Sequence, residues 1–197
     1  KLDVLDTAQR YLCAVIHNYY LSNLETTEAV ITDNMGLLDV ATLSHKVFRN
    51  DILSISTMQD GSLNHIDKIE YNDLSRMGNT YLSGNIDYRM WWQFGGVINI
   101  FPVQEELNVN VSYIKEPRLF YEDEGDVGSN QDGECDLDMV LIDPLLDFAE
   151  ANLWKIDNKP NRVKLAFEIG TNAVKLLNDR FAQERTTGVG QVGQGNR

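Results

Sequence analysis

The sequence has few cysteines, no long apolar run and no excess of positive charge. Its two cysteines, Cys13 and Cys135, lie far apart and match no metal-binding or redox spacing. We therefore expect free thiols rather than a disulfide framework. No apolar run approaches the roughly 20 residues that a membrane-spanning helix needs, and nothing resembles a signal peptide, so we expect a soluble, untargeted protein that contacts no membrane.

The net charge of −13 argues against a large phosphate-binding surface, because nucleic-acid affinity comes mostly from Lys and Arg side chains that neutralise phosphates. The charge is also uneven. Residues 151–197 carry eight Lys and Arg against four Asp and Glu, a net charge of +4, which leaves −17 for residues 1–150. This asymmetry predicts that the C-terminal part meets an acidic surface, such as that of a neighbouring copy; the alternative is an ordinary solvated helix face.

Residues that could perform chemistry are scarce. His17, His45 and His65 lie in unrelated segments, without a cysteine or carboxylate at ligand spacing, so we interpret each as structural. The sequence contains no nucleophile-elbow, phosphate-loop, dinucleotide-binding or zinc-protease motif. We therefore expect no enzymatic activity and no cofactor.

Two features are candidates for ligand binding. Residues 122–138 form an acidic, glycine-rich segment in which oxygen-bearing side chains alternate: Asn130, Asp132, Glu134, Asp136 and Asp138. The segment fails as a calcium-binding EF-hand, because aligning Gly133 with the invariant glycine places Met139 where the bidentate Glu belongs, so we expect a solvated loop. Trp91 and Trp92 could form a sugar-stacking platform, but adjacent strand residues point to opposite faces, which favours core or interface packing.

Apolar periodicity predicts the local structure. Within residues 2–24, apolar residues recur at helical spacing, which predicts an amphipathic helix. Between about residues 28 and 120, short segments rich in β-branched residues are separated by Asp, Asn and Gly, which predicts strands. Gly95-Gly96 between two apolar arms predicts a β-hairpin in which Trp91 faces Ile100. Helical spacing returns after residue 140 and is broken at Asn158 to Asn161, which predicts a helical hairpin.

Together these patterns predict an α+β fold. The α-helical bundle would comprise an N-terminal helix (residues 1–25) and the helical hairpin (140–185), with a small antiparallel β module over residues 28–120. We expect one domain over residues 1–185, including the acidic loop at 122–138. Gly alternates with Val and Gln in residues 186–197, which predicts a flexible C-terminal tail.

The order of these segments resembles the head-to-tail adaptor (connector) proteins of tailed bacteriophages. The resemblance covers most of residues 45–185 and is strongest from Tyr88 to Leu119, which contains the hairpin Trp-x-Phe-Gly-Gly-x-Ile-x-Ile-Phe-Pro and the strand Leu-x-Val-x-Val-x-Tyr. Residues 48–53 and 69–74 resemble the family's earlier strand entry and its strand-to-helical-turn step. These patterns carry no catalytic signature.

The resemblance implies a structural virion protein that forms a ring, commonly of twelve copies, beneath the portal protein. The ring would join the portal to tail or nozzle proteins, with helices around a DNA channel and the C-terminal tail reaching the portal or a neighbour. It would lie at the head–tail junction of the virion and in the host cytoplasm during assembly. DNA would pass without sequence-specific binding, because an acidic ring repels its backbone.

Seven residues are candidates for contacts in such a ring. Lys159 and Arg162 follow the helix break, where side chains are expected to be exposed. The complete set is Lys159, Arg162, Trp91, Gly188, Val189, Val192 and Arg197. The alternative function is a tail or baseplate component that binds Ca²⁺ or a receptor glycan through the acidic loop and the tryptophans.

Overall fold

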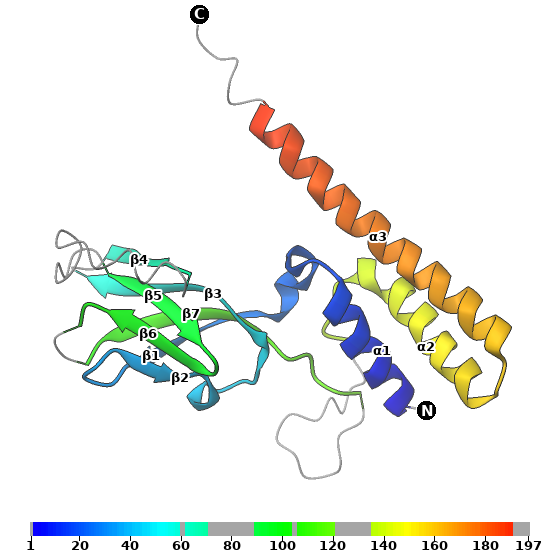
Figure 1. Cartoon of the computed structure of the whole chain (residues 1–197), viewed down its shortest axis with the longest axis horizontal. Coiled ribbons are helices and arrows are strands. Elements are labelled where there is room, and N and C mark those ends of the chain that lie inside the picture. The colour runs from blue at the N-terminus through cyan, green and yellow to red at the C-terminus, as the bar shows by residue number, and fades with distance from the viewer. Residues whose placement is uncertain (1, 60–61, 71–88, 104–105, 121–134, 191–197) are drawn as a thin grey trace, which may run out of the picture. The chain divides into compact units, whose positions relative to one another are not determined.

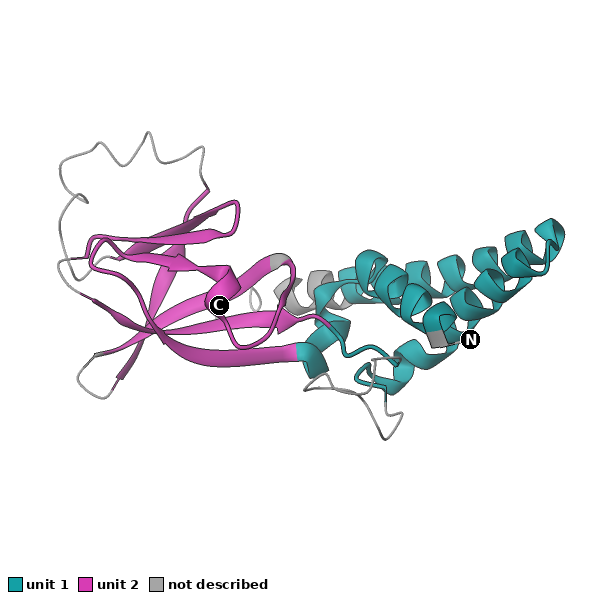
Figure 2. Cartoon of the chain, turned by 90° about the horizontal axis from the view of Figure 1, so that it is seen from below, with its two compact units in different colours: residues 1–24, 117–197 teal, residues 25–116 magenta. Residues whose placement is uncertain are grey.

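The computed structural model describes residues 2–59, 62–70, 89–103, 106–120 and 135–190. The chain divides into two compact units (Figure 2). One unit combines residues 1–24 with residues 117–197 and contains the long helices, and the other spans residues 25–116 and contains the sheet. These boundaries lie within a few residues of the predicted ends of the β module, while the single domain expected over residues 1–185 stays a prediction.

The sheet unit contains seven strands among its described residues, paired in the order β1-β7-β3-β4-β5-β6-β2 (Figure 1). All neighbouring pairs are antiparallel except β4 and β5, which run parallel. The short 3-10 helix η2 (Val40–Thr42) follows β2. The strands are β1 (Glu25–Ile31), β2 (Leu37–Asp39), β3 (Val47–Gln59), β4 (Ser62–Lys68), β5 (Met90–Phe94), β6 (Val97–Phe101) and β7 (Asn108–Lys115).

The predicted fold class, a helical bundle with a small antiparallel β module, is wrong. The main element is a curled, mixed sheet that resembles a half-barrel. Its continuity depends on the parallel pairing of Asp67 with Met90 and of Lys68 with Trp91. That pairing joins the β5–β6 hairpin to the other strands, and because it is nonlocal, the periodicity within each segment contains no sign of it.

Local signals did predict the hairpin. Trp91 lies opposite Ile100 and Phe94 lies opposite Val97, so the predicted register is confirmed. Of the two turn glycines, only Gly95 has a positive φ, at 60°, which is the pattern of a type II′ turn. A fully buried Trp91 on β5 and a fully buried Ile100 on β6 then contribute to the core of the sheet.

A carboxylate ties the segment after η2 to the sheet. Glu28 on β1 accepts hydrogen bonds from the hydroxyl of Ser44 (2.7 Å), the amide of Ser44 (2.9 Å) and the hydroxyl of Tyr113 on β7 (3.0 Å). These bonds, chiefly the one from the Ser44 hydroxyl, lower the pKa of Glu28. The pKa of Tyr113 is raised, first by burial and then by its bond to Glu28. Both shifts favour an ionised Glu28 beside a neutral Tyr113.

The helical unit begins with α1 (Leu2–Val15) and the 3-10 helix η1 (Asn18–Leu24). The sequence predicted one continuous helix over residues 2–24, but the structure interrupts it. The side chain of Asn178 donates to the carbonyl of Val15 (3.1 Å) and accepts from the amide of His17 (2.9 Å). These bonds satisfy backbone groups at the end of α1, which explains why the helix can stop there.

The predicted helical hairpin is present. The 3-10 turn η4 (Met139–Leu141) leads into α2 (Ile142–Ile156), and α3 (Pro160–Gly190) follows after a turn in which Asn158 has φ 56°. The helix α3 continues to Gly190, so the predicted helix end at residue 185 was too early. Residues 186–190, assigned to a flexible tail, are helical, whereas residues 191–197 lie outside the described part of the chain.

Candidate subunit interface

An aromatic cluster defines the inner side of the helical unit. The ring of Phe148 on α2 lies 4.8 Å from that of Tyr11 on α1 and 5.5 Å from that of Phe167 on α3. Gly170 allows α2 and α3 to approach, because a Cβ atom there would lie only 3.0 Å from the Phe148 ring. The outer face of α2 is therefore opposite Phe148. On α3 the buried residues Ala166, Gly170 and Val174 mark the inner face, whereas Phe167 is 41% exposed.

The outer face of α2 carries apolar side chains that the helical unit does not cover. On α2 itself Leu146 is 54% exposed, and on the preceding turn η4 Met139 is 88% exposed. Three apolar residues recur there every seven positions, and three exposed carboxylates recur at the same interval beside them. We call this surface the acidic ridge; it comprises Met139, Leu146 and Leu153 with Asp143, Glu150 and Asp157.

The outer face of α3 carries a second exposed apolar surface, flanked by arginines. Ile169 and Leu176 lie seven residues apart, and Leu176 is 70% exposed. An exposed arginine lies at each end of this stretch. We call this surface the basic ridge; it comprises Leu165, Ile169 and Leu176 with Arg162 and Arg180.

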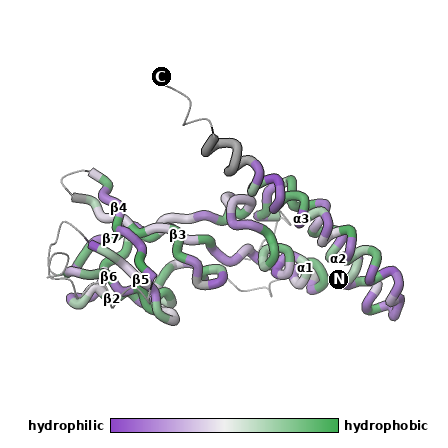
Figure 3. The backbone as a smooth tube through the Cα atoms, turned by 45° about the horizontal axis from the view of Figure 1, so that its top comes forward, coloured by the Kyte–Doolittle hydropathy of each residue, from purple (hydrophilic) through white to green (hydrophobic). Residues whose placement is uncertain are grey.

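The two ridges face away from the aromatic cluster that α2 and α3 share. Leu146 and Leu153 lie across α2 from Phe148, and Leu165 and Leu176 lie across α3 from Phe167, as the helical repeat requires. Asp143 of the acidic ridge nevertheless lines the same pocket as Leu176 and Arg180 of the basic ridge, so the two ridges adjoin within one copy. Figure 3 shows hydrophobic segments interspersed with hydrophilic ones along both helices. Apolar surface left open in this way is typical of protein–protein contact sites.

Two predicted interface residues lie at the turn between α2 and α3. Lys159 and Arg162 are both exposed, and the amide of Lys159 donates to the carbonyl of Trp154 (3.0 Å). The guanidinium of Arg162 stacks 4.3 Å from the ring centroid of Trp154, whose indole nitrogen donates to Glu150 (2.7 Å). Trp154 thus orders the first arginine of the basic ridge beside a carboxylate of the acidic ridge.

The other predicted interface residues are not brought to these ridges. Trp91 is fully buried in the sheet core, and the Lys68 ammonium lies 4.9 Å from its ring. Gly188 and Val189 belong to α3, where their side chains are not described, and Val192 and Arg197 lie outside the described residues. The sequence analysis did not predict that Met139, Leu146 and Leu153 are exposed, although their seven-residue spacing can be read from the sequence.

Little of the described structure is arranged for chemistry. No group of three or more His, Cys, Asp or Glu within the described residues is placed to hold a metal ion. His17 stacks on Phe181 at 3.9 Å, and its Nδ1 accepts the amide of Tyr19. Burial is the main cause that raises the pKa of Cys135, so its reactive thiolate form is disfavoured.

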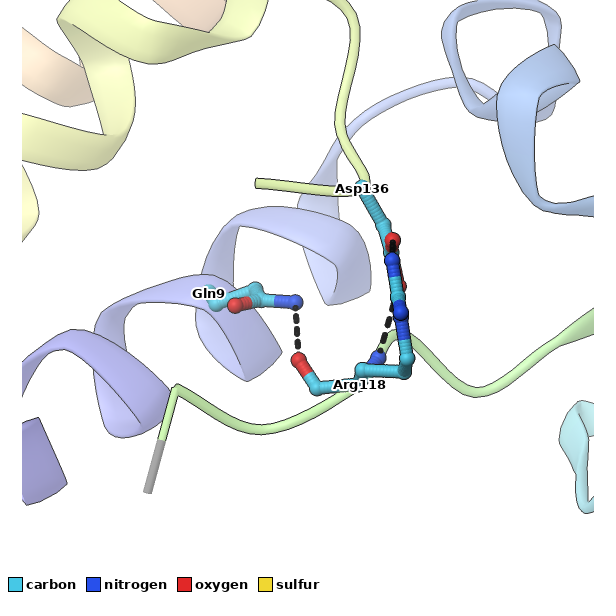
Figure 4. Close-up of polar contacts among 3 residues, drawn as sticks. All are labelled: Gln9, Arg118 and Asp136. Carbon is cyan, nitrogen blue, oxygen red and sulfur yellow. Dashed lines mark hydrogen bonds and ion pairs between the residues drawn. The ribbon is translucent and has the colours of Figure 1, made fainter. Parts of the chain in front are cut away.

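Two of the five candidate cation ligands in the acidic segment have structural partners. Asp136 accepts from the guanidinium of Arg118 at 2.6 and 3.0 Å and from its amide at 3.1 Å, while the side chain of Gln9 donates to the Arg118 carbonyl (Figure 4). Asp138 caps η4 by accepting the amide of Val140. The remaining three, at positions 130, 132 and 134, lie outside the described residues.

Comparison with protein-family models finds no match, and comparison with curated proteins finds none either. Within the described part of the chain, no helix combines the length and apolar content needed to cross a membrane.

Proposed function

We propose that this chain is a structural, ring-forming adaptor of a tailed bacteriophage that links the portal to the tail and lines the DNA exit channel, without catalysing a reaction. The observation that carries the proposal is the pair of exposed apolar ridges on α2 and α3, one flanked by carboxylates and one by arginines. Neither ridge is covered by its own helical unit.

A protein with two different adhesive faces associates head to tail. Such heterologous contacts generate rings when the rotation between copies closes, whereas a two-fold dimer reuses one self-complementary patch. The helix α3 has 31 residues and is therefore about 46 Å long. A helix of this length supplies an extended contact surface for neighbouring copies.

The place of the ring in the virion comes from the sequence resemblance to head-to-tail adaptors. Its partners are then the portal protein and a tail or nozzle protein, at the head–tail junction and, during assembly, in the host cytoplasm. The net charge of −13 is compatible with a channel through which DNA moves without being held, because like charges repel.

The proposal is tested by measuring the mass of the full chain across a range of concentrations, alone and with portal rings of its own phage, and by imaging the products by electron microscopy. We expect rings that sit on one end of the portal. A chain that stays monomeric under both conditions and does not bind the portal would overturn the proposal.

A further inference from the structure

We propose that the open edge of β1 binds an extended segment of a different protein, which pairs with β1 as an additional strand of the sheet. β1 is the first strand in the sheet order and pairs only with β7, so its other side carries no strand among the described residues. The inference does not depend on the proposed ring, because the contact lies in the sheet unit and its test measures peptide binding rather than assembly.

The ladder between β1 and β7 assigns the backbone groups of the open side. The amide of Thr32 donates to the carbonyl of Leu107 (3.0 Å), and these two residues continue the register that pairs Ile31 with Asn108. Hydrogen-bonded pairs alternate along an antiparallel ladder, so the backbone groups of residues 26, 28 and 30 point to β7. Those of residues 25, 27, 29 and 31 therefore point outward, and all four of these residues are exposed.

The edge of β1 lacks the features that usually protect an edge strand from pairing. Such features are prolines, lysines, bulges and short length. β1 contains neither Pro nor Lys, and its ladder with β7 runs through all seven residues without a bulge. The strand at the opposite edge of the sheet, β2, has only three residues. β1 is therefore the edge that can accept a strand several residues long.

The charge of β1 disfavours a second copy as the occupant. Two copies of β1 that paired antiparallel over their full length would place Glu28 directly opposite Glu28, and like charges in that position destabilise a sheet. The hydrogen bonds from Ser44, together with that from Tyr113, lower the pKa of Glu28 and keep it ionised. Among the described strands only β2 has another open edge, and it is too short to cover β1. The occupant is therefore a segment of different sequence.

The side chains of β1 define which segment fits. Thr26, Glu28 and Val30 are half-buried, and Val30 packs against the core of the sheet. An added strand would extend this core with an apolar side chain next to Val30 and would place a neutral polar one next to Glu28. The exposed Glu25 favours a Lys or Arg opposite it. The partner is thus an extended segment that alternates in polarity and carries basic side chains on its solvent face.

The test uses the full chain and a fluorescent synthetic peptide, Thr-Val-Lys-Thr-Thr-Val-Lys, whose residues would lie opposite residues 31 to 25 in that order. One peptide variant carries N-methyl groups at the two residues opposite Thr27 and Ala29, whose amides would donate to β1. The matched control carries N-methyl groups at the two residues opposite Thr26 and Glu28, whose amides would point away. Fluorescence anisotropy measures the affinity of each peptide.

Two variants of the chain make the same comparison from the other side. Ala29→Pro removes an outward-facing amide and leaves the bonds to β7 intact, as a proline in an edge strand can. The matched control Ala29→Thr keeps that amide and is favourable in a strand. Circular dichroism and melting temperature establish that both variants fold.

We expect methylation opposite Thr27 and Ala29 to weaken binding by about tenfold or more, because two hydrogen bonds are lost. Ala29→Pro should weaken it to a similar extent. The control peptide and Ala29→Thr should bind within about threefold of the unmodified pair, since they keep those bonds. Added peptide should also slow the amide hydrogen exchange of Thr27 and Ala29.

Several results would overturn the proposal. They are a peptide that does not bind at its highest soluble concentration, equal weakening by the two methylation patterns, and slowed exchange in β2 instead of β1. If Ala29→Pro does not fold, the methylated peptides decide the question with the wild-type chain. Protection of β1 that rises with the concentration of the chain alone would assign the edge to a second copy and overturn the choice of occupant.

Discussion

Two glycines of the sheet unit have the same backbone requirement but different surroundings. Gly36 has φ 76° and Gly95 has φ 60°. A Cβ atom added at Gly36 would clash with the carbonyl oxygen of Ile100 and lie 2.5 Å from Cγ2 of Val103, whereas one added at Gly95 would meet nothing within 4 Å. Substituting each by alanine therefore separates backbone strain from steric conflict.

The expected costs follow from these surroundings. Gly95→Ala incurs only the left-handed backbone strain, about 1–2 kcal/mol. Gly36→Ala incurs the same strain and adds an overpacking cost of about 1–3 kcal/mol. It also disturbs the hydrogen bond that the Gly36 carbonyl accepts from the amide of Ile100 (2.8 Å), which contributes about 1 kcal/mol. We expect a total loss of about 3–6 kcal/mol at Gly36.

Urea unfolding followed by tryptophan fluorescence measures both losses, and thermal melting gives an independent check. In a chain of this size, 1 kcal/mol corresponds to about 2–4 °C. Gly95→Ala should thus lower the melting temperature by a few degrees, and Gly36→Ala by roughly three times as much. Equal losses at the two positions would refute the steric argument, and no loss at Gly95 would refute the strain argument.

Three further predictions concern charged groups and are read by thermal melting at several pH values. Glu28→Gln should destabilise the sheet unit at neutral pH; because the folded pKa of Glu28 is lowered, the effect should fade as pH falls through that pKa. Asp147→Asn should stabilise the helical unit at neutral pH and have no effect below the ordinary aspartate pKa of about 3.9, because folding raises the pKa of Asp147. Arg118→Ala should cost about 1 kcal/mol or less, because the Arg118 side chain that binds Asp136 is 45% exposed; a larger loss would contradict this exposure argument.

The sequence predicted the features that depend on neighbours along the chain. The register of the hairpin around Gly95 follows from a two-residue turn, and the turn near Asn158 follows from a break in helical spacing. Features that depend on distant residues were not predicted. The parallel pairing of β4 with β5 and the interruption of the first helix by Asn178 both join segments far apart in sequence.

The exposure of the ridge leucines was beyond sequence reasoning for a different reason. Apolar residues occur around much of the circumference of both helices, so periodicity alone cannot tell which of them face the core. Leu153, one of the residues that predicted the helix, is exposed, whereas Phe148 and Ala151 are buried. Which face of α2 is buried depends on where α1 and α3 pack against it, and that packing is tertiary.

The structure also bears on the charge asymmetry, for which the sequence left two interpretations. An ordinary solvated face would carry charged side chains without large apolar ones between them. The flank of α3 with Lys164 fits that description, since Lys164 pairs with Glu168 at 3.8 Å one helical turn away. The basic ridge differs, because Ile169 and Leu176 lie exposed between Arg162 and Arg180. Burial of those side chains against another surface would contribute free energy that charge alone does not.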